Sequence, residues 1–349
     1  MSTTKNRRGG YAVVFLPHGR SLRFSRRTAV TGTASVLVCL GLFALGLFTG
    51  TYHITAPQVL DVLGGGGDAI DRFIVLGQRM PRICAALLVG AGLGLAGSLF
   101  QSLSGNPLGS PDIIGFTTGS TTGALAALLI GGSTAGPGPG GGALLGGLAT
   151  AVAVHLITTM RGVSGGSRLI VTGIAVGAML ASVNDFLITR ADVESAESAK
   201  AWTFGSLNAV TWSQVAPMAA VFPVLLAMTA VLARPLQIMG MGDDTAAGLG
   251  VRVERVRALT LLVGITWTAM AIAVAGPIGF LALAAPQLAR RAARVTGVPV
   301  ATAALMGAVL LASADYAGQR VLSPFQIPVG LVTGALGGLY LMWLLWQRD

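Results

Sequence analysis

Ionisable side chains that could couple transport to an ion gradient are scarce in this sequence of 349 residues. Such a mechanism needs acidic groups buried near the middle of a membrane. Only Asp112, Asp185 and Asp315 lie within or beside the long apolar stretches, and each lies near the end of its stretch. An ion-coupled carrier is therefore the more distant of the functions that the sequence leaves open.

The residues of a self-sufficient ATPase or of a metal site are also missing. A phosphate-binding P-loop requires Gly-Lys followed by Ser or Thr, and the only lysines, Lys5 and Lys200, have no such context. The 3 histidines share no ligand spacing and the 2 cysteines have no neighbour in sequence, so we predict no metal, no cofactor and no disulfide. No nucleophile with a base and an orienting group is evident, so we expect a non-catalytic chain.

A polar break rich in Pro and Gly interrupts the apolar sequence at residues 100–116, FQSLSGNPLGSPDIIGF. Pro107 and Pro111 stop helix propagation and restrict the backbone before them. Asn106 can hydrogen-bond a backbone group that the turn leaves free. These residues predict a structured turn, and by themselves they leave open whether it is also a working part.

A second polar segment, residues 235–257, is too short to span a membrane but carries helix signals. Asp243 or Asp244 can cap the N-terminus of a short helix, and Gly248 or Gly250 can end it. A structured element of this kind suggests a docking surface for another protein. From its residues alone, an ordinary basic loop is an equally good interpretation.

These segments must be held by membrane helices. The chain is 53% hydrophobic and 10% charged, with a mean hydropathy of +0.75, whereas soluble domains carry roughly 25% charged residues. Its apolar runs are continuous, which excludes the alternating strands of a membrane barrel, and its 50 glycines let membrane helices approach closely. We predict an all-α, polytopic membrane protein with about ten transmembrane helices in one bundle. The candidate spans are residues 30–50, 80–102, 113–132, 142–160, 168–189, 213–233, 257–276, 278–292, 299–317 and 327–346.

Positive charge predicts the orientation. An inside N-terminus places most of the 23 Lys and Arg residues on the cytoplasmic side, so both termini are predicted to be cytoplasmic. Residues 1–27 then form a basic tail, and residues 28–349 form one transmembrane domain. A twin-arginine export signal at residues 25–27 is less favoured, because the apolar run that follows is long and has no clear cleavage site. Topology accounts for the net charge of +10, so no nucleic-acid partner is predicted. The glycine tracts 64–67 and 136–142 are expected to be outside loops.

Four motifs together resemble the FecCD-type permease family of ABC importers, which move iron-siderophores and cobalamin. The likeness runs in one register from about residue 30 to the end, and the first two motifs are closest to the permease subunits of ferric enterobactin import. It implies a permease subunit that moves a ferric-siderophore across the cytoplasmic (inner) membrane, with a cobalamin or haem permease as the close alternative. The motifs are FQSLSGNPLGSPDIIGFTTG (100–119), MGDDTAAGLGVRVERVR (241–257), AGPIGFLALAAPQLARR (275–291) and IPVG (327–330).

The resemblance also implies partners. They are two cytoplasmic ABC ATPase subunits, a second permease subunit that makes a heterodimer, an extracytoplasmic siderophore-binding protein, and membrane lipid. Residues 235–257 match the family's coupling loop, which fits the cleft of the ATPase that a chain without its own P-loop needs. The coupling residues carried over are Gly242, Asp243, Asp244, Thr245, Gly248, Leu249, Gly250, Arg252 and Glu254.

Two segments correspond to the family's cytoplasmic gate. Residues 103–112 are the turn between the second and third helices, and residues 165–169 are the loop between the fourth and fifth, where relatives can place hydroxyl residues instead of glycines. Relatives also often carry Pro-His where this chain has Pro-Gln at 286–287, and the residues assign no chemistry to that Gln. The gate residues carried over are Asn106, Pro107, Leu108 and Ser167.

Arginines at the outer helix ends correspond to those that receive acidic residues of the binding protein, a contact suited to guanidinium geometry. Anchoring of the helix ends by snorkelling is the alternative. The translocation path is expected along the fifth helix and the segment after it, although a Trp beyond a helix end is as typical of an interfacial belt. The docking residues are Arg79, Arg82 and Arg320, and the path residues are Asn184, Trp202, Ser206 and Asn208.

Overall fold

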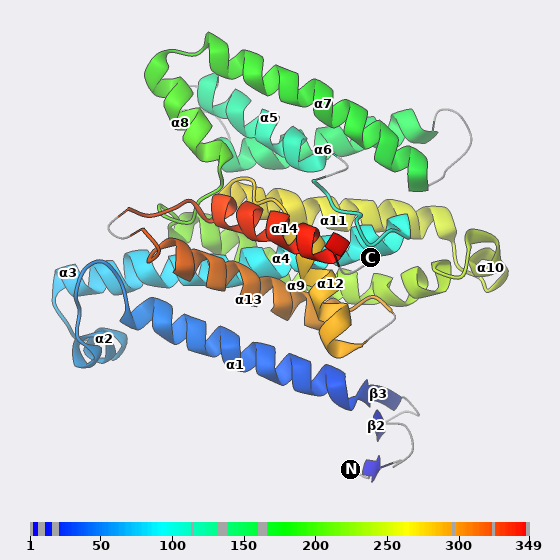
Figure 1. Ribbon diagram of the computed structural model, residues 1–349, viewed down its shortest axis with the longest axis horizontal. Helices are drawn as coiled ribbons and strands as arrows, with labels where there is room; N and C mark the ends of the chain where they lie inside the picture. Colours follow the sequence, from blue (N-terminus) through cyan, green and yellow to red (C-terminus); the bar gives the residue numbers. More distant parts are fainter. Residues whose placement is uncertain are drawn as a thin grey trace.

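The computed structural model describes residues 3–5, 11–15, 21–112, 115–130, 138–159, 166–294, 297–322 and 325–346. Within them, ten helices of 13 residues or more lie where the sequence predicts apolar runs (Figure 1). They are α1 (Arg26–Phe48), α4 (Met80–Ser104), α5 (Phe116–Leu129), α6 (Gly138–Thr159), α7 (Gly166–Arg190), α9 (Trp212–Met239), α11 (Val253–Ala275), α12 (Leu281–Ala293), α13 (Val300–Gly318) and α14 (Val329–Trp346).

Among the described residues, 7 helical stretches are long and apolar enough to cross a membrane. Helices α5 and α12 have 14 and 13 residues, about 20 Å at a rise of ~1.5 Å per residue, which is shorter than the ~30 Å hydrocarbon core. The predicted helical, multi-span character is therefore confirmed. The count of ten spans stays a prediction.

Three short strands precede α1, where the sequence predicts only a basic tail. They are β1 (Thr3–Lys5), β2 (Tyr11–Phe15) and β3 (Ser21–Ser25), paired antiparallel in the order β1-β2-β3. The sequence of β2, YAVVF, is rich in aromatic and β-branched residues, which favour strands. Helix α1 then begins at Arg26, because the hydroxyl of Ser25 caps it by accepting a bond from the Thr28 N–H at 3.0 Å. The all-α prediction thus holds only from α1 onward.

Helix α4 lies at the centre of the bundle and packs on its neighbours through glycines. Gly97 touches the backbone of Ala282 in α12 so closely that a methyl group at Gly97 would overlap the Ala282 carbonyl oxygen. Gly90 faces the backbone of Gly307 in α13 in the same way. Small residues give membrane helices their contact area in this manner, so the high glycine content serves helix packing.

Helices α5 and α6 form a second closely packed pair. Gly142 of α6 lies against the backbone of Gly123 in α5, leaving no room for a side chain. The expected outside loop at residues 136–142 is therefore wrong from residue 138 onward, where the structure has helix. Its glycines allow the close approach of two helices. Residues 131–137 lie outside the described part of the chain.

The helical run that contains α4 begins earlier than the sequence predicts. Helix α3 (Ala69–Arg72) continues through the π-helical turn η1 (Phe73–Arg79) into α4. The wider helix precedes Pro81, which lacks the N–H of a regular helical bond. Residues 79–82 therefore lie inside a helix and do not open one.

The two ends of the bundle carry different segments. Helices α2 (Ala56–Leu63), α3 and α8 (Val193–Thr203) lie at one end, and the N-terminal strands and α10 (Asp243–Gly248) lie at the other (Figure 1). We call these the α8 end and the α10 end. Segments predicted to be extracytoplasmic thus share the α8 end, and segments predicted to be cytoplasmic share the α10 end.

Candidate functional site

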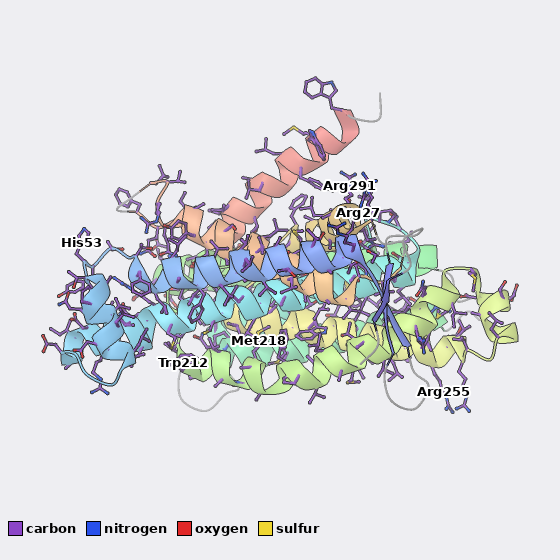
Figure 2. All side chains as sticks on the ribbon, turned by 90° about the horizontal axis from the view of Figure 1, so that it is seen from below. Arg27, His53, Trp212, Met218, Arg255 and Arg291 are labelled. Carbon is purple, nitrogen blue, oxygen red and sulfur yellow. The ribbon has the colours of Figure 1, made fainter. Side chains whose placement is uncertain are left out.

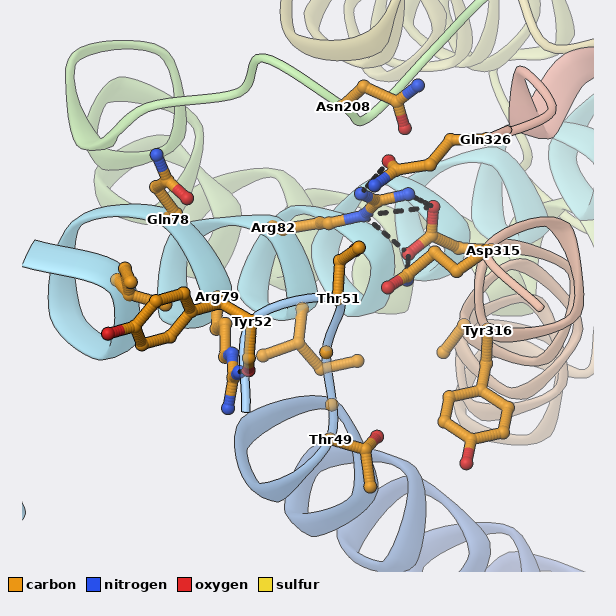
Figure 3. A pocket seen from close by; sticks show the side chains of 16 residues that line it. Thr49, Thr51, Tyr52, Gln78, Arg79, Arg82, Asn208, Asp315, Tyr316 and Gln326 are labelled. Carbon is orange, nitrogen blue, oxygen red and sulfur yellow. Dashed lines mark hydrogen bonds and ion pairs between the residues drawn. The ribbon is translucent and has the colours of Figure 1, made fainter. Parts of the chain in front are cut away.

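A polar pocket of about 200 Å³ lies at the α8 end, between α1, α4 and α13 (Figure 3). Its lining includes Arg79, Arg82 and Asn208, together with Asp315 and Gln326. The pocket thus joins two of the predicted docking arginines with one of the predicted path residues. No feature of the local sequence linked them, because they come from distant segments.

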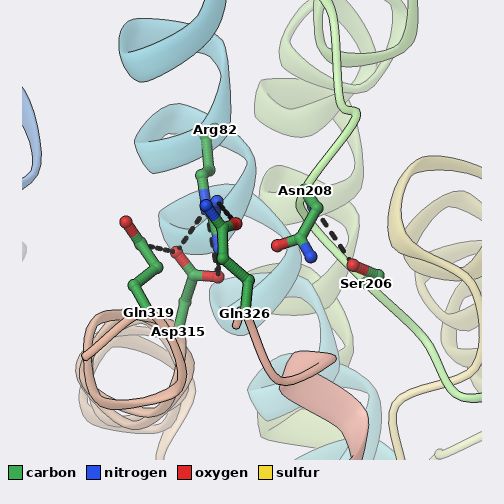
Figure 4. A network of polar contacts seen from close by, with 6 residues as sticks. All are labelled: Arg82, Ser206, Asn208, Asp315, Gln319 and Gln326. Carbon is green, nitrogen blue, oxygen red and sulfur yellow. Dashed lines mark hydrogen bonds and ion pairs between the residues drawn. The ribbon is translucent and has the colours of Figure 1, made fainter. Parts of the chain in front are cut away.

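Each guanidinium nitrogen of Arg82 donates a hydrogen bond in this pocket (Figure 4). It donates to both carboxylate oxygens of Asp315, with Nη2 at 2.9 Å from Oδ1 and Nε at 3.0 Å from Oδ2. Its Nη1 donates to Gln326 at 2.8 Å, and Gln319 donates to Asp315 at 2.8 Å. A bidentate, charge-assisted pair of this kind is both strong and directional, so it fixes α4 to α13 at the α8 end.

The other two predicted docking arginines differ from Arg82. Arg79 is buried and donates to the backbone carbonyl oxygens of Leu47 and Tyr52, so it holds the segment that leaves α1. Arg320 is exposed, with its guanidinium carbon 4.5 Å from the centre of the Tyr316 ring. In this structure, Arg320 is the predicted docking arginine whose charged group is most available to a partner.

The predicted path residues do not form one cluster. Asn184 is buried in α7, and its side-chain oxygen has no hydrogen-bond partner among the described residues. Trp202 of α8 packs against the cluster of Ala124, Ala143 and Ile272. Ser206 binds the carbonyl of Ala275 through its backbone N–H at 2.7 Å, and its hydroxyl accepts from the Asn208 N–H at 3.2 Å. Of these residues, Asn208 alone lines the polar pocket.

At the α10 end, a turn of residues 105–112 follows α4; we call it the gate turn. The Asn106 side chain accepts a bond from the Leu108 N–H at 2.9 Å, as its chemistry predicted. The carbonyl oxygen of Pro107 accepts a bond from Gln287 of α12 at 2.7 Å, and Gln287 accepts from the hydroxyl of Tyr340 at 3.2 Å. The sequence assigned no role to Gln287, although an amide is the side chain that can donate and accept at once.

The far end of the gate turn is also tied to α12. Asp112 is half-buried, and its carboxylate accepts from the Thr117 hydroxyl at 2.6 Å and from the backbone N–H of Phe280. Desolvation raises the pKa of Asp112, and these two hydrogen bonds oppose the rise. The turn is therefore fixed to α12 at two points.

The second predicted gate segment, residues 165–169, is helical from residue 166 onward. Residues from 166 onward belong to α7, so Ser167 lies on its first turn, and residue 165 lies outside the described residues. A gate role for Ser167 stays a prediction.

The short helix predicted after α9 is present as α10. Its N-cap is Gly242, whose φ of 108° suits glycine, so the prediction that Asp243 or Asp244 caps it is wrong by one residue. The helix ends at Gly248 as expected. The carboxylate of Asp243 instead pairs with Arg257 at 2.7 Å.

Helix α10 presents apolar side chains as well as charges to solvent. Met241, just before the helix, is 60% exposed, and Leu249, just after it, is 62% exposed. Both side chains lie at the tip of this element, where a partner can contact them. The other predicted coupling residues are exposed too: Gly242, Asp243, Asp244, Thr245, Gly248, Gly250, Arg252 and Glu254.

Comparison with known proteins agrees with this arrangement. The ferric enterobactin transport system permease protein FepG of Escherichia coli is 42% identical over 325 residues, 93% of this chain and 98% of that protein. The iron(3+)-hydroxamate import system permease protein FhuG of Bacillus subtilis is 34% identical over 338 residues, 93% of this chain and 99% of that protein. A solved metal-chelate type ABC transporter in an inward-facing conformation matches with a TM-score of 0.81 at 25% identity, covering 91% of this chain and 99% of that chain. Since the model of the FecCD transport family matches residues 37–347, this chain belongs to that family.

Proposed function

We propose that this chain is the permease subunit of an ABC importer that moves a ferric-siderophore across the cytoplasmic membrane. The observation that carries the proposal is the similarity, along almost the whole length of both chains, to a ferric enterobactin permease. With ten spans and both termini inside, the α10 end faces the cytoplasm and the polar pocket faces outward. The excess of Lys and Arg in segments at the α10 end supports this orientation.

Energy comes from partners. Two cytoplasmic ATPases dock on α10, where Met241 and Leu249 offer apolar contacts and the surrounding charges set the register. They bind and hydrolyse ATP, and this chain supplies two conformations whose balance they shift. The gate turn changes its position between these conformations. The hydrogen bonds that tie it to α12 can break and form again as it moves.

A siderophore-binding protein docks at the α8 end. Its acidic residues meet Arg320 first, and Arg82 contributes once Asp315 releases it. Charge pairs at the rim of an interface favour encounter and orientation. A related permease subunit completes the dimer, and the path runs between the two subunits along α7, where the side-chain oxygen of Asn184 lacks a partner within the described chain.

The test is uptake of radio-iron-loaded siderophores by cells with and without this chain, with labelled cobalamin measured in parallel. Loss of ferric-siderophore uptake alone is the expected result. Loss of cobalamin uptake, or of neither, would overturn the substrate assignment. Uptake that persists after the partner ATPase is inactivated would favour an ion-coupled carrier instead.

A further inference from the structure

A basic pocket lies at the α10 end between the first turn of α1 and the last turn of α12. Its volume is about 510 Å³, and it is lined by Arg26 and Arg27 from α1, by Arg291 from α12 and by Arg294, the C-cap of α12. Arg27 and Arg291 lie close together in Figure 2, although they are far apart in the sequence. Tertiary structure thus concentrates four cations around one hollow.

No acidic group in the neighbouring sequence neutralises these cations. Residues 1–60 and 255–314 contain neither Asp nor Glu. Among the described residues, ion pairs are formed by Arg82 and Arg257, and none by the four arginines of this basic pocket. Converging like charges repel one another, so the arrangement is favoured when an anion lies among them.

The surroundings of the basic pocket point to an anion with apolar chains. Val30 lies in its lining and is 61% exposed, and the exposed apolar face of α1 continues from there into the span. The guanidinium carbon of Arg291 lies 5.6 Å from the centre of the Trp343 ring, and Trp is enriched where membrane meets water. The hollow therefore opens at headgroup level onto a surface that acyl chains can cover.

We propose that this basic pocket binds the phosphate headgroup of an anionic phospholipid in the cytoplasmic leaflet. The four arginines hold the phosphate by charge-assisted hydrogen bonds, and the acyl chains lie along α1. A free phosphate would use the same cations, but it would leave the apolar strip at Val30 without a role. The lipid ties α1 to α12, the helix that holds the gate turn.

The test uses the purified full-length chain with its partner subunits in detergent, and native mass spectrometry to count bound lipids. Phosphatidylglycerol, cardiolipin and phosphatidylcholine are added separately. We expect the two anionic lipids to bind more tightly than phosphatidylcholine, and their binding to weaken as salt is raised. If the unmodified protein binds phosphatidylcholine as tightly as the anionic lipids, or if salt does not change the binding of the anionic lipids, the proposal is overturned.

A matched pair of variants locates the site. Arg27→Gln with Arg294→Gln removes one pocket arginine from each helix, and we expect anionic lipid to bind about 30-fold more weakly, since each Arg near an anionic surface contributes roughly a factor of five. Arg234→Gln with Arg255→Gln removes the same charge from exposed positions outside the pocket lining and should leave binding unchanged. Equal loss in both variants would mean a general positive surface and would overturn the proposal.

A third arm separates lipid from free phosphate. Inorganic phosphate and glycerol 3-phosphate at millimolar concentration should fail to displace bound phosphatidylglycerol. Displacement by either one would assign the pocket to a soluble phosphate and overturn the lipid assignment. If the double variant unfolds, Arg27→Lys with Arg294→Lys keeps the charge and should retain lipid binding; its failure to do so while folded would count against the site.

Discussion

The amide of Gln287 donates a hydrogen bond of 2.7 Å to the carbonyl oxygen of Pro107, joining α12 to the gate turn. The same side chain accepts a bond of 3.2 Å from Tyr340, so α14, α12 and the turn are linked through one residue. A backbone carbonyl is a strong hydrogen-bond acceptor, and the Gln287 amide supplies a donor for that of Pro107. Gln287 is therefore one of the two points that hold the gate turn against α12.

Replacing Gln287 with Glu should loosen the gate turn. The carboxylate keeps the bond from Tyr340 but cannot donate to Pro107, and the loss of one hydrogen bond corresponds to about a fivefold change in population. We expect a thiol reagent to label Ser110→Cys, at a buried position of the turn, roughly five times faster when Gln287→Glu is added. The labelling is measured after the free cysteines Cys39 and Cys84 are changed to Ser.

The matched control for the gate is Tyr340→Phe. It removes the bond to Gln287 but leaves the amide free to donate to Pro107. Labelling at residue 110 should change much less than with Gln287→Glu. If the two variants behave alike, Gln287 acts through α14 packing and not through the gate turn.

Removing the charge of Arg82 should strongly destabilise the fold. Asp315 is 4% exposed and would remain as an unpaired buried carboxylate, which costs about 3–5 kcal/mol. We expect Arg82→Gln to lower the midpoint of thermal unfolding in detergent, followed by tryptophan fluorescence. Arg320→Gln, at an exposed arginine, should leave the midpoint nearly unchanged.

The double variant Arg82→Gln with Asp315→Asn separates stability from docking. It removes both charges together, so much of the lost stability should return. If Arg82 also receives the binding protein, docking should stay weak in the double variant. Recovery of stability and docking together would limit Arg82 to a structural role.

The apolar side chains beside α10 should hold the ATPase. Truncating Leu249 to Ser removes an exposed apolar contact, and we expect about tenfold less ATPase to co-purify with the permease, a typical effect for an anchor residue at an interface. Val321→Ser, at an exposed apolar residue following α13, is the matched control. Equal ATPase recovery from the two variants would argue against α10 as the docking element.

Gly97 should tolerate no side chain. A methyl group there would overlap the carbonyl of Ala282 and push α4 from α12, and overpacking of this kind costs about 1–3 kcal/mol. We expect Gly97→Ala to lower the unfolding midpoint. Gly41→Ala in α1, with nothing within 4 Å of the added carbon, should have no adverse effect. A stable Gly97→Ala protein would mean that α4 and α12 can separate without loss.

Local chemistry made much of the fold predictable from sequence. Apolar runs located the ten long helices, and Pro and Gly located the gate turn and the short helix α10. The Asx-type bond from the Leu108 N–H to the Asn106 side chain was predictable as well, because its two partners are 2 residues apart. Such features depend on neighbours in the chain, and so the sequence displays them directly.

Tertiary structure alone decided which distant residues meet. Gln287 lies 180 residues from Pro107, and Asp315 lies 233 residues from Arg82. In a chain whose helices are apolar on all sides, hydropathy does not tell which helices are neighbours. Close packing through glycines decides that, and it also brings the arginines of α1 and α12 around one pocket. The sequence by itself determined the membrane fold and its family, and the packing of the helices determined the contacts at the gate turn, the polar pocket and the basic pocket.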